Sequence, residues 1–142
     1  MKDINGEIQY KNRVYKLAFN LNVMQAIQRQ YGSIEAWGSL TDGTECAKRL
    51  YEAEKHDVSW EQLPEAEKAK YPAEPDVEAV IFGFTEMLNE GIEIDNDENG
   101  TDLKLMTTKQ VGRMITEVGM SNALGKLQKT VVDSTQSTEK NE

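Results

Sequence analysis

The sequence predicts a single α+β domain that is mostly α-helical, with an N-terminal β-hairpin packed on a small bundle of short helices. Over residues 7–19, apolar and polar residues alternate with the two-residue period of a half-buried strand. From residue 22 onward, apolar residues recur every three or four positions, as on one face of a helix. The length of 142 residues is typical of one domain.

The predicted hairpin turns at residues 11–13, where Asn12 tolerates the positive φ of a tight turn. The apolar side chains expected on its strands are Ile8, Tyr10, Tyr15, Leu17 and Phe19. A two-stranded hairpin alone is only marginally stable in water. We therefore expect the helix that follows the hairpin to cover its apolar face.

Three short helices are predicted next. Asn22 is expected to cap the first helix, which would end at Gly32 because glycine readily adopts the left-handed conformation of a helix stop. Ser33 is expected to cap the second helix. Thr44 is expected to cap the third helix, which would run to about Lys55.

The segment of residues 57–75 is highly charged and contains all three prolines of the chain. A helix between Pro64 and Lys70 would have almost no apolar face, so it would lie on the surface. We interpret residues 57–75 as a protruding insertion or linker within the domain.

The clearest helix is predicted between Asp76, its N-cap, and Gly91, its stop. Its apolar residues recur at spacings of three and four and are Val77, Val80, Ile81, Phe84, Met87 and Leu88. Such a broad stripe is typical of a central core helix. After Gly91, alternation at residues 92–94 and 103–105 predicts a second small hairpin that turns around residues 97–100.

Two more helices are predicted in the C-terminal part of the chain. The first is expected to be capped by Thr107 or Thr108 and to end at Gly119. Residues 133–142 contain no strongly apolar side chain. We therefore expect a disordered polar tail over residues 133–142, after a single domain of residues 1–132.

The composition excludes several classes of partner. The chain has 25 Asp and Glu against 16 Lys and Arg, a net charge of −9, whereas nucleic-acid-binding domains normally carry a basic face. No stretch approaches the roughly 20 apolar residues of a membrane span, and no apolar secretion signal is visible. The single cysteine, Cys46, excludes an internal disulfide. We expect a cytoplasmic protein that binds neither nucleic acid nor membrane.

Two patterns suggest a metal site, and both are incomplete. The residues that fit the first half of an EF-hand calcium loop are Asp95, Asp97, Asn99 and Gly100. The twelfth position needs a bidentate glutamate and is Met106, so an acidic turn is the favoured interpretation. The only histidine, His56, would lie about 15 Å from Cys46 along a continuous helix. No nucleotide-binding glycine loop or Ser-His-Asp arrangement is present, so we expect no catalytic residue, metal or cofactor.

Three aromatic residues are the candidates for partner binding: Trp60, Tyr71 and Trp37. Exposed tryptophan and tyrosine side chains often anchor interfaces. Trp60 and Tyr71 lie in the charged segment of residues 57–75, which offers little core to bury them. The competing interpretation is that both tryptophans complete the core.

The hairpin and the helix after it also resemble a known family. The residues that carry the resemblance are Tyr15, Lys16, Leu17, Phe19, Asn20, Tyr31, Gly32 and Ser33. A strand of this kind, leading into a helix that breaks at Tyr-Gly-Ser, resembles the opening of the tail assembly chaperones of long-tailed phages. The later helices resemble those of the family only in their general pattern.

The resemblance implies a non-catalytic protein that binds the tape measure protein and helps to recruit tail tube subunits in the cytoplasm of a bacterial host. Self-association stays open. The main alternative is a structural phage component, such as a head-tail connector or a minor tail protein. An acidic mimic of nucleic acid and an enzyme rank lower.

Overall fold

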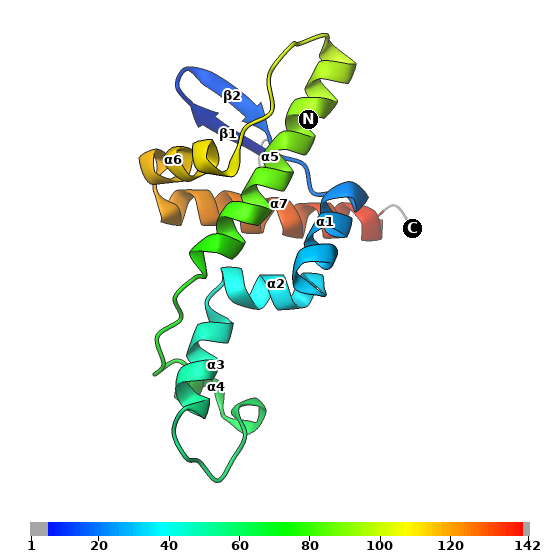
Figure 1. Ribbon diagram of the computed structural model, residues 1–142. Helices are drawn as coiled ribbons and strands as arrows, with labels where there is room; N and C mark the ends of the chain where they lie inside the picture. The colour runs from blue at the N-terminus through cyan, green and yellow to red at the C-terminus, as the bar shows by residue number, and fades with distance from the viewer. Residues whose placement is uncertain (1–5, 141–142) are drawn as a thin grey trace.

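The computed structural model describes residues 6–140, and the side chains of residues 6–134. Within this range the fold is α+β and mostly α-helical, as the sequence predicts (Figure 1). The elements in chain order are β1 (Glu7–Tyr10), β2 (Arg13–Lys16), α1 (Leu21–Tyr31), α2 (Ile34–Thr41), α3 (Thr44–Glu52), the 3₁₀ turn η2 (Trp60–Gln62), α4 (Glu65–Lys68), α5 (Val77–Asn99), α6 (Thr108–Val118) and α7 (Met120–Lys140). Helix α5 crosses the middle of the molecule and contacts β2, α1, α2, α6 and α7.

Strands β1 and β2 form the predicted antiparallel hairpin, in which Tyr10 lies opposite Arg13. Positive φ angles at Lys11 (48°) and Asn12 (64°) close the two-residue turn. Both central residues of such a turn need positive φ, which explains the asparagine. Ile8 on β1 is buried in the main core, but the helices that mainly cover the hairpin are α5, against β2, and α7, against β1, rather than the helix directly after the hairpin, which the sequence predicts.

Helix α1 begins earlier than predicted, because Asn20 rather than Asn22 is its cap. The backbone of Asn20 is extended (φ −132°, ψ −171°), and its side chain accepts a hydrogen bond from the Val23 amide at 3.3 Å. The side-chain amides of Asn20 and Asn22 both donate to Glu90 Oε2, at 2.8 and 3.0 Å. These bonds connect the start of α1 to α5.

The predicted stop and cap between α1 and α2 are confirmed. Gly32 has a φ of 92°, and the Ser33 hydroxyl accepts a hydrogen bond from the α2 backbone at 3.0 Å. Helix α3 differs slightly from the prediction. Thr44 is its first residue rather than its cap, and the helix ends at Glu52 rather than near Lys55.

Gly91 does not end α5, contrary to the prediction. The helix continues to Asn99, and Gly100 in the left-handed conformation (φ 70°) ends it. A Cβ atom at Gly91 would overlap the carbonyl group of Lys16. The backbone after β2 lies so close to α5 that the Ala18 amide donates to the Met87 carbonyl at 3.1 Å. The glycine therefore permits contact between two backbones.

The predicted second hairpin at residues 92–105 is wrong, because its first strand is part of α5. Two asparagines of α5 bind the returning chain instead. The Asn96 side chain accepts from the Leu103 amide and donates to the Leu103 carbonyl, both at 3.0 Å. Asn89 does the same with Met106, at 2.8 and 2.9 Å. Each side-chain amide thus replaces the backbone of a neighbouring strand.

One main hydrophobic core surrounds α5. Its largest fully buried side chains are Trp37, Phe84, Ile8, Ile27, Met87, Leu88, Ile92, Met114 and Leu127. The Trp37 indole stacks on Phe19, with ring centroids 6.3 Å apart, and lies over Gly83, where any side chain would overlap it. Its Nε1 donates to the Ala79 carbonyl at 3.0 Å, so α2 is fixed to α5 by both packing and a hydrogen bond.

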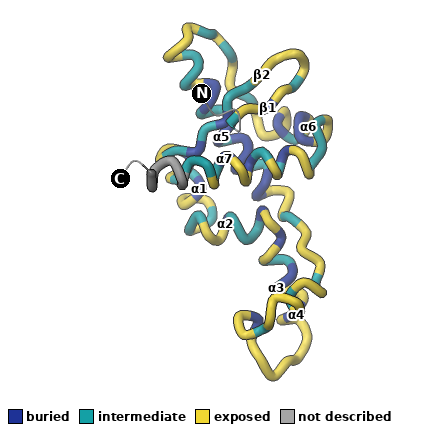
Figure 2. The backbone as a smooth tube through the Cα atoms, turned by 180° about the vertical axis from the view of Figure 1, so that it is seen from behind, coloured by how far each residue is buried: buried dark blue, intermediate teal, exposed yellow. Residues whose placement is uncertain are grey.

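A smaller lobe, residues 42–75, extends away from this core and contains α3, η2 and α4 (Figure 1). Most of its residues are exposed, as the yellow parts of the tube in Figure 2 show. The two chain segments that join the lobe to the body lie side by side. The Asp76 amide donates to the Leu40 carbonyl at 2.8 Å just outside the lobe, and Gly43 lies directly against the backbone of Ala73 just inside it.

The boundary predicted for the polar tail at residue 133 also shifts. Helix α7 continues through Lys140, so residues 133–140 extend a helix rather than begin a separate tail. The Ser134 hydroxyl donates to the Phe19 carbonyl at 2.8 Å, which holds this part of α7 against the start of α1. Adding turns to an existing helix is much easier than nucleating one, so polar residues suffice here. Residues 141–142 lie outside the described residues.

Glu86, Glu90 and Glu93 lie about one helical turn apart on α5, and their negative charges affect the stability of the fold. Burial raises the pKa of the Glu86 carboxyl above its ordinary value of 4.5, and the charges of Glu90 and Glu93 raise the pKa further. Protonation of Glu86 therefore stabilises the folded protein. This contribution is fully present below pH 4.5 and is lost as the pH rises through the raised pKa.

We expect Glu86→Gln to raise the melting temperature at pH 7, because it removes a partly buried negative charge. The gain should shrink on acidification and disappear by about pH 4, where the wild-type carboxyl is protonated as well. Thermal unfolding followed by circular dichroism between these pH values measures the difference. A gain that is the same at both pH values would show that the charge of Glu86 is not responsible.

Candidate functional site

Two of the three aromatic candidates for partner binding are buried. Trp37 is only 2% exposed and belongs to the main core. Trp60 is 6% exposed and packs in a second cluster with Ala47 and Tyr51 of α3. The expectation that Trp60 lacks a core is therefore wrong, because the smaller lobe builds a core of its own.

Aromatic rings make up most of this second core. Tyr51, Trp60 and Tyr71 contact one another pairwise, with ring centroids 5.5 to 6.1 Å apart. Tyr71 remains half-buried at the edge of the cluster. The segment of residues 57–75 thus folds back onto α3, and the aromatic residues that suggested an interface instead hold this segment in place.

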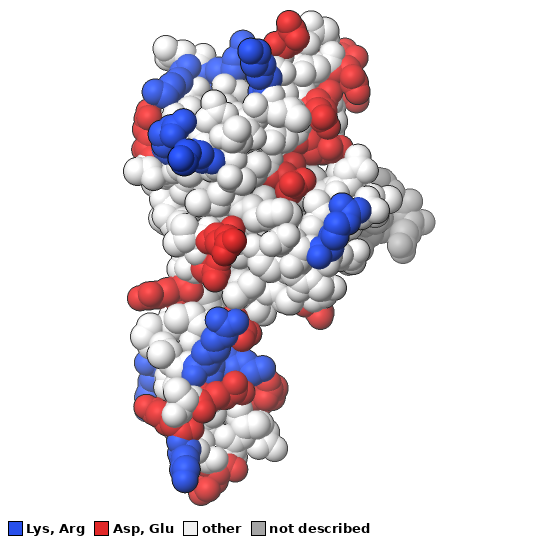
Figure 3. All heavy atoms as spheres, in the orientation of Figure 1, with Lys and Arg blue, Asp and Glu red and all other residues white. Residues whose placement is uncertain are grey.

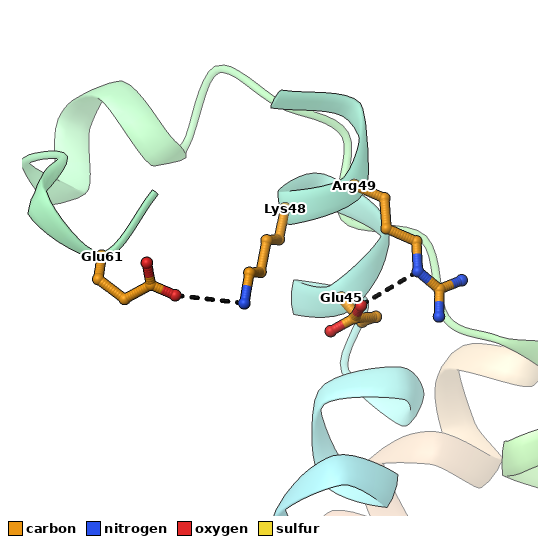
Figure 4. Close-up of polar contacts among 4 residues, drawn as sticks. All are labelled: Glu45, Lys48, Arg49 and Glu61. Carbon is orange, nitrogen blue, oxygen red and sulfur yellow. Dashed lines mark hydrogen bonds and ion pairs between the residues drawn. The ribbon is translucent and has the colours of Figure 1, made fainter. Parts of the chain in front are cut away.

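Two ion pairs lie on the surface of the lobe, and one of them joins the segment of residues 57–75 to α3 (Figure 4). Lys48 of α3 lies 3.2 Å from Glu61 of η2, and Arg49 lies 3.1 Å from Glu45 within α3. The hydrogen bond to Glu61 raises the pKa of the Lys48 amine. Because one partner of each pair is largely exposed to water, these pairs contribute to geometry more than to stability.

The residues considered for metal binding do not form a site. Asp95, Asp97 and Asn99 lie in the last turns of α5, and the Asn99 amide donates to Asp95 at 3.0 Å. A calcium loop has to wrap around its ion, which a regular helix does not do. His56 stacks on the Tyr51 ring at 3.8 Å. Among the described residues, no group of three or more His, Cys, Asp or Glu side chains is placed to hold a metal.

A groove of about 850 Å³ that is open to a ligand lies between the end of α1, the first half of α5, and α6. Its apolar lining consists of Tyr31, Val77, Ile81 and Phe82. Val77 is 55% exposed, and the other three are half-buried. Apolar surface of this kind is left open to water on the body of the protein, close to the main core.

The floor of the groove has a fixed geometry. Tyr31 and Phe82 meet edge to face, with centroids 5.6 Å apart and planes at 75°. Burial raises the pKa of the Tyr31 hydroxyl, and the nearby charges of Glu78 and Asp76 raise the pKa further. The tyrosine is therefore neutral over the physiological range and serves as a hydrogen-bonding group at the edge of an apolar floor.

The two sides of the groove carry opposite charges. Lys109 and Arg113 of α6 line one side, and Glu78 of α5 belongs to the other. Figure 3 shows basic side chains gathered over α6 beside a broad surface without charge. Neither Lys109 nor Arg113 forms an ion pair with another described residue. The groove is thus apolar along its floor and electrically polar across its width.

Sequence reasoning misses this groove. The apolar stripe of α5 includes Val77 and Ile81, and periodicity alone places both in the core. The available signal lies in α6, where Lys109, Gly112 and Arg113 follow helical spacing on the face opposite to the apolar one. A glycine between two cations on an exposed helix face marks a hollow only once the neighbouring helix is known.

Comparison of the chain with protein-family models, curated proteins and solved structures gives no match. Within residues 6–140, no helix has both the length and the apolar composition that crossing a lipid bilayer requires.

Proposed function

We propose that this chain is a non-catalytic tail assembly chaperone of a long-tailed phage or prophage, which binds the tape measure protein and helps to recruit tail tube subunits. The observation that carries the proposal is the open groove between α1, α5 and α6, with its partly exposed apolar floor. A groove formed by helices is a common binding surface for a helical segment of another protein.

The residues that carry the family resemblance give additional support. Leu17 and Phe19 are buried in the main core beside α5, Asn20 caps α1, and Gly32 and Ser33 form the break before α2. They define the way in which the hairpin leads into the helices. A similar opening in this chain and in the chaperones is therefore expected to reflect a similar arrangement of hairpin and helix.

The test is co-expression with the tape measure protein encoded in the same phage or prophage. We expect the two chains to co-purify and the tape measure protein to become more soluble than when it is expressed alone. Failure to co-purify, with both chains soluble, would contradict the proposal. Detection of this chain in purified virions would instead favour the alternative of a structural component, since an assembly chaperone is expected to be absent from the finished particle.

A further inference from the structure

The groove leaves a continuous apolar strip open to water. Val77 and Ile81 lie one turn apart on α5, and Tyr31 and Phe82 extend the strip toward α1. Covering such a strip removes apolar surface from water, which is the main driving force of most protein association. The strip lies where α5 runs beside α6 and the end of α1.

The shape of the groove fits another helix. Lys109, Arg113 and Thr116 line it at one-turn intervals along α6, a span of about 10 Å. Gly112 lies between them and faces α5: a Cβ atom there would be in ordinary van der Waals contact with Ile81 Cδ1, at 3.6 Å, so the absence of a longer side chain leaves the trough between α5 and α6 open. A third helix packs into such a trough at an interaxial distance of about 8–10 Å.

The charges of the groove select the composition of that helix. Lys109 and Arg113 have no ionic partner among the described residues, although the chain as a whole has a net charge of −9. At physiological ionic strength, charges beyond about 8 Å are largely screened, so the cations nearest the groove dominate. Glu78 on the α5 side disfavours an acid there and favours a base.

From these observations we propose that the groove binds an amphipathic α-helix of the partner protein. The helix has an apolar stripe at spacings of three and four residues, with acidic residues along the flank that faces α6. The inference rests on the proposed function only in taking the occupant to be a segment of another protein. It adds where that segment binds, which chemistry is recognised, and which flank of the helix faces Lys109 and Arg113.

The direct test uses two synthetic helical peptides of about 18 residues, or about five turns. Both carry the same leucine stripe, and one flank is glutamate in the first peptide and lysine in the second. Fluorescence anisotropy should show that the wild-type protein binds the glutamate peptide about tenfold more tightly than the lysine peptide. Equal affinity, or no binding of either peptide up to about 1 mM, would overturn the proposal.

Variants of the protein test whether the peptides bind in the groove. The double variant Lys109→Glu/Arg113→Glu should reverse the preference between the peptides. The control Lys55→Glu/Lys104→Glu makes the same change in net charge at exposed positions outside the groove and should leave the preference unchanged. Gly112→Leu fills the trough and should weaken both peptides about tenfold or more. If Lys109→Glu/Arg113→Glu or Gly112→Leu binds the peptides as the wild type does, the site lies elsewhere and the proposal is overturned.

The same variants separate this inference from the proposed function. If the tape measure protein co-purifies equally with the wild type and with Gly112→Leu, the function stands and the groove is not its site. If the tape measure protein does not bind but the glutamate peptide does, the groove inference stands and the proposed function fails. Sedimentation of the protein alone gives the last outcome: self-association that Gly112→Leu abolishes would make a second copy the occupant and overturn the proposal.

Discussion

Replacing Gly91 by alanine is expected to destabilise the protein by about 3 kcal/mol or more, although alanine is the better helix former. The added Cβ atom would overlap the carbonyl group of Lys16, which belongs to the backbone and cannot rotate away as a flexible side chain would. To relieve the overlap, α5 and the chain after β2 have to move apart. That movement would break the hydrogen bond from the Ala18 amide to the Met87 carbonyl.

Gly125 provides a matched control for this substitution. It also lies inside a helix, α7, and a Cβ atom there has no neighbour within 4 Å. Gly125→Ala is therefore expected to be neutral or to stabilise by up to about 1 kcal/mol through helix propensity alone. Urea unfolding followed by circular dichroism compares the two variants with the wild type. Equal unfolding midpoints for both variants would mean that β2 and α5 do not approach as closely as described.

Phe84→Ala is expected to cost roughly 3–5 kcal/mol, a large fraction of the stability of a small domain. Phe84 is completely buried in the middle of α5, where the packing of the main core leaves little freedom to collapse around a cavity. The variant should unfold at a much lower temperature or accumulate as insoluble protein. Calorimetric melting of the purified variant, or the soluble fraction when purification fails, measures the effect.

Val77→Ala is the control for Phe84→Ala, since it shortens an apolar side chain on the same helix and in the same sequence stripe. Val77 is 55% exposed in the groove, so its truncation should change stability by no more than about 0.5 kcal/mol. A wild-type melting temperature for Phe84→Ala would refute the central position of α5. A large loss for Val77→Ala would show that the groove is closed in solution.

The two parts of α5 thus have different tasks. The segment around Phe84 and Leu88 is buried and organises the core, whereas the first turns present Val77 and Ile81 to the groove. A binding surface built on the end of a core helix is held rigidly, so little conformational freedom is lost when a partner binds. This favours the groove over the smaller lobe as the site of recognition.

Local features of the fold were predictable from the sequence. The Asn12 turn, the stop and cap at Gly32 and Ser33, and the end of α6 at Gly119 all follow the predictions. Thr107 caps α6 in a reciprocal pair of hydrogen bonds with Gln110, at 2.9 and 3.1 Å. In each case the deciding hydrogen bond or φ preference involves residues close together in the chain.

Other features depend on contacts between residues that are distant in the chain, and only the tertiary structure decided these. The sequence predicts a helix stop at Gly91, whereas the structure places the backbone of Lys16 against this glycine. The sequence also predicts an exposed Trp60, whereas the structure packs it against Tyr51 and Tyr71. The groove likewise exists only because α5 and α6 lie side by side, leaving Val77 uncovered. Periodicity and capping residues determine that a segment is helical and which face is apolar. They carry no information about whether another part of the chain covers that face.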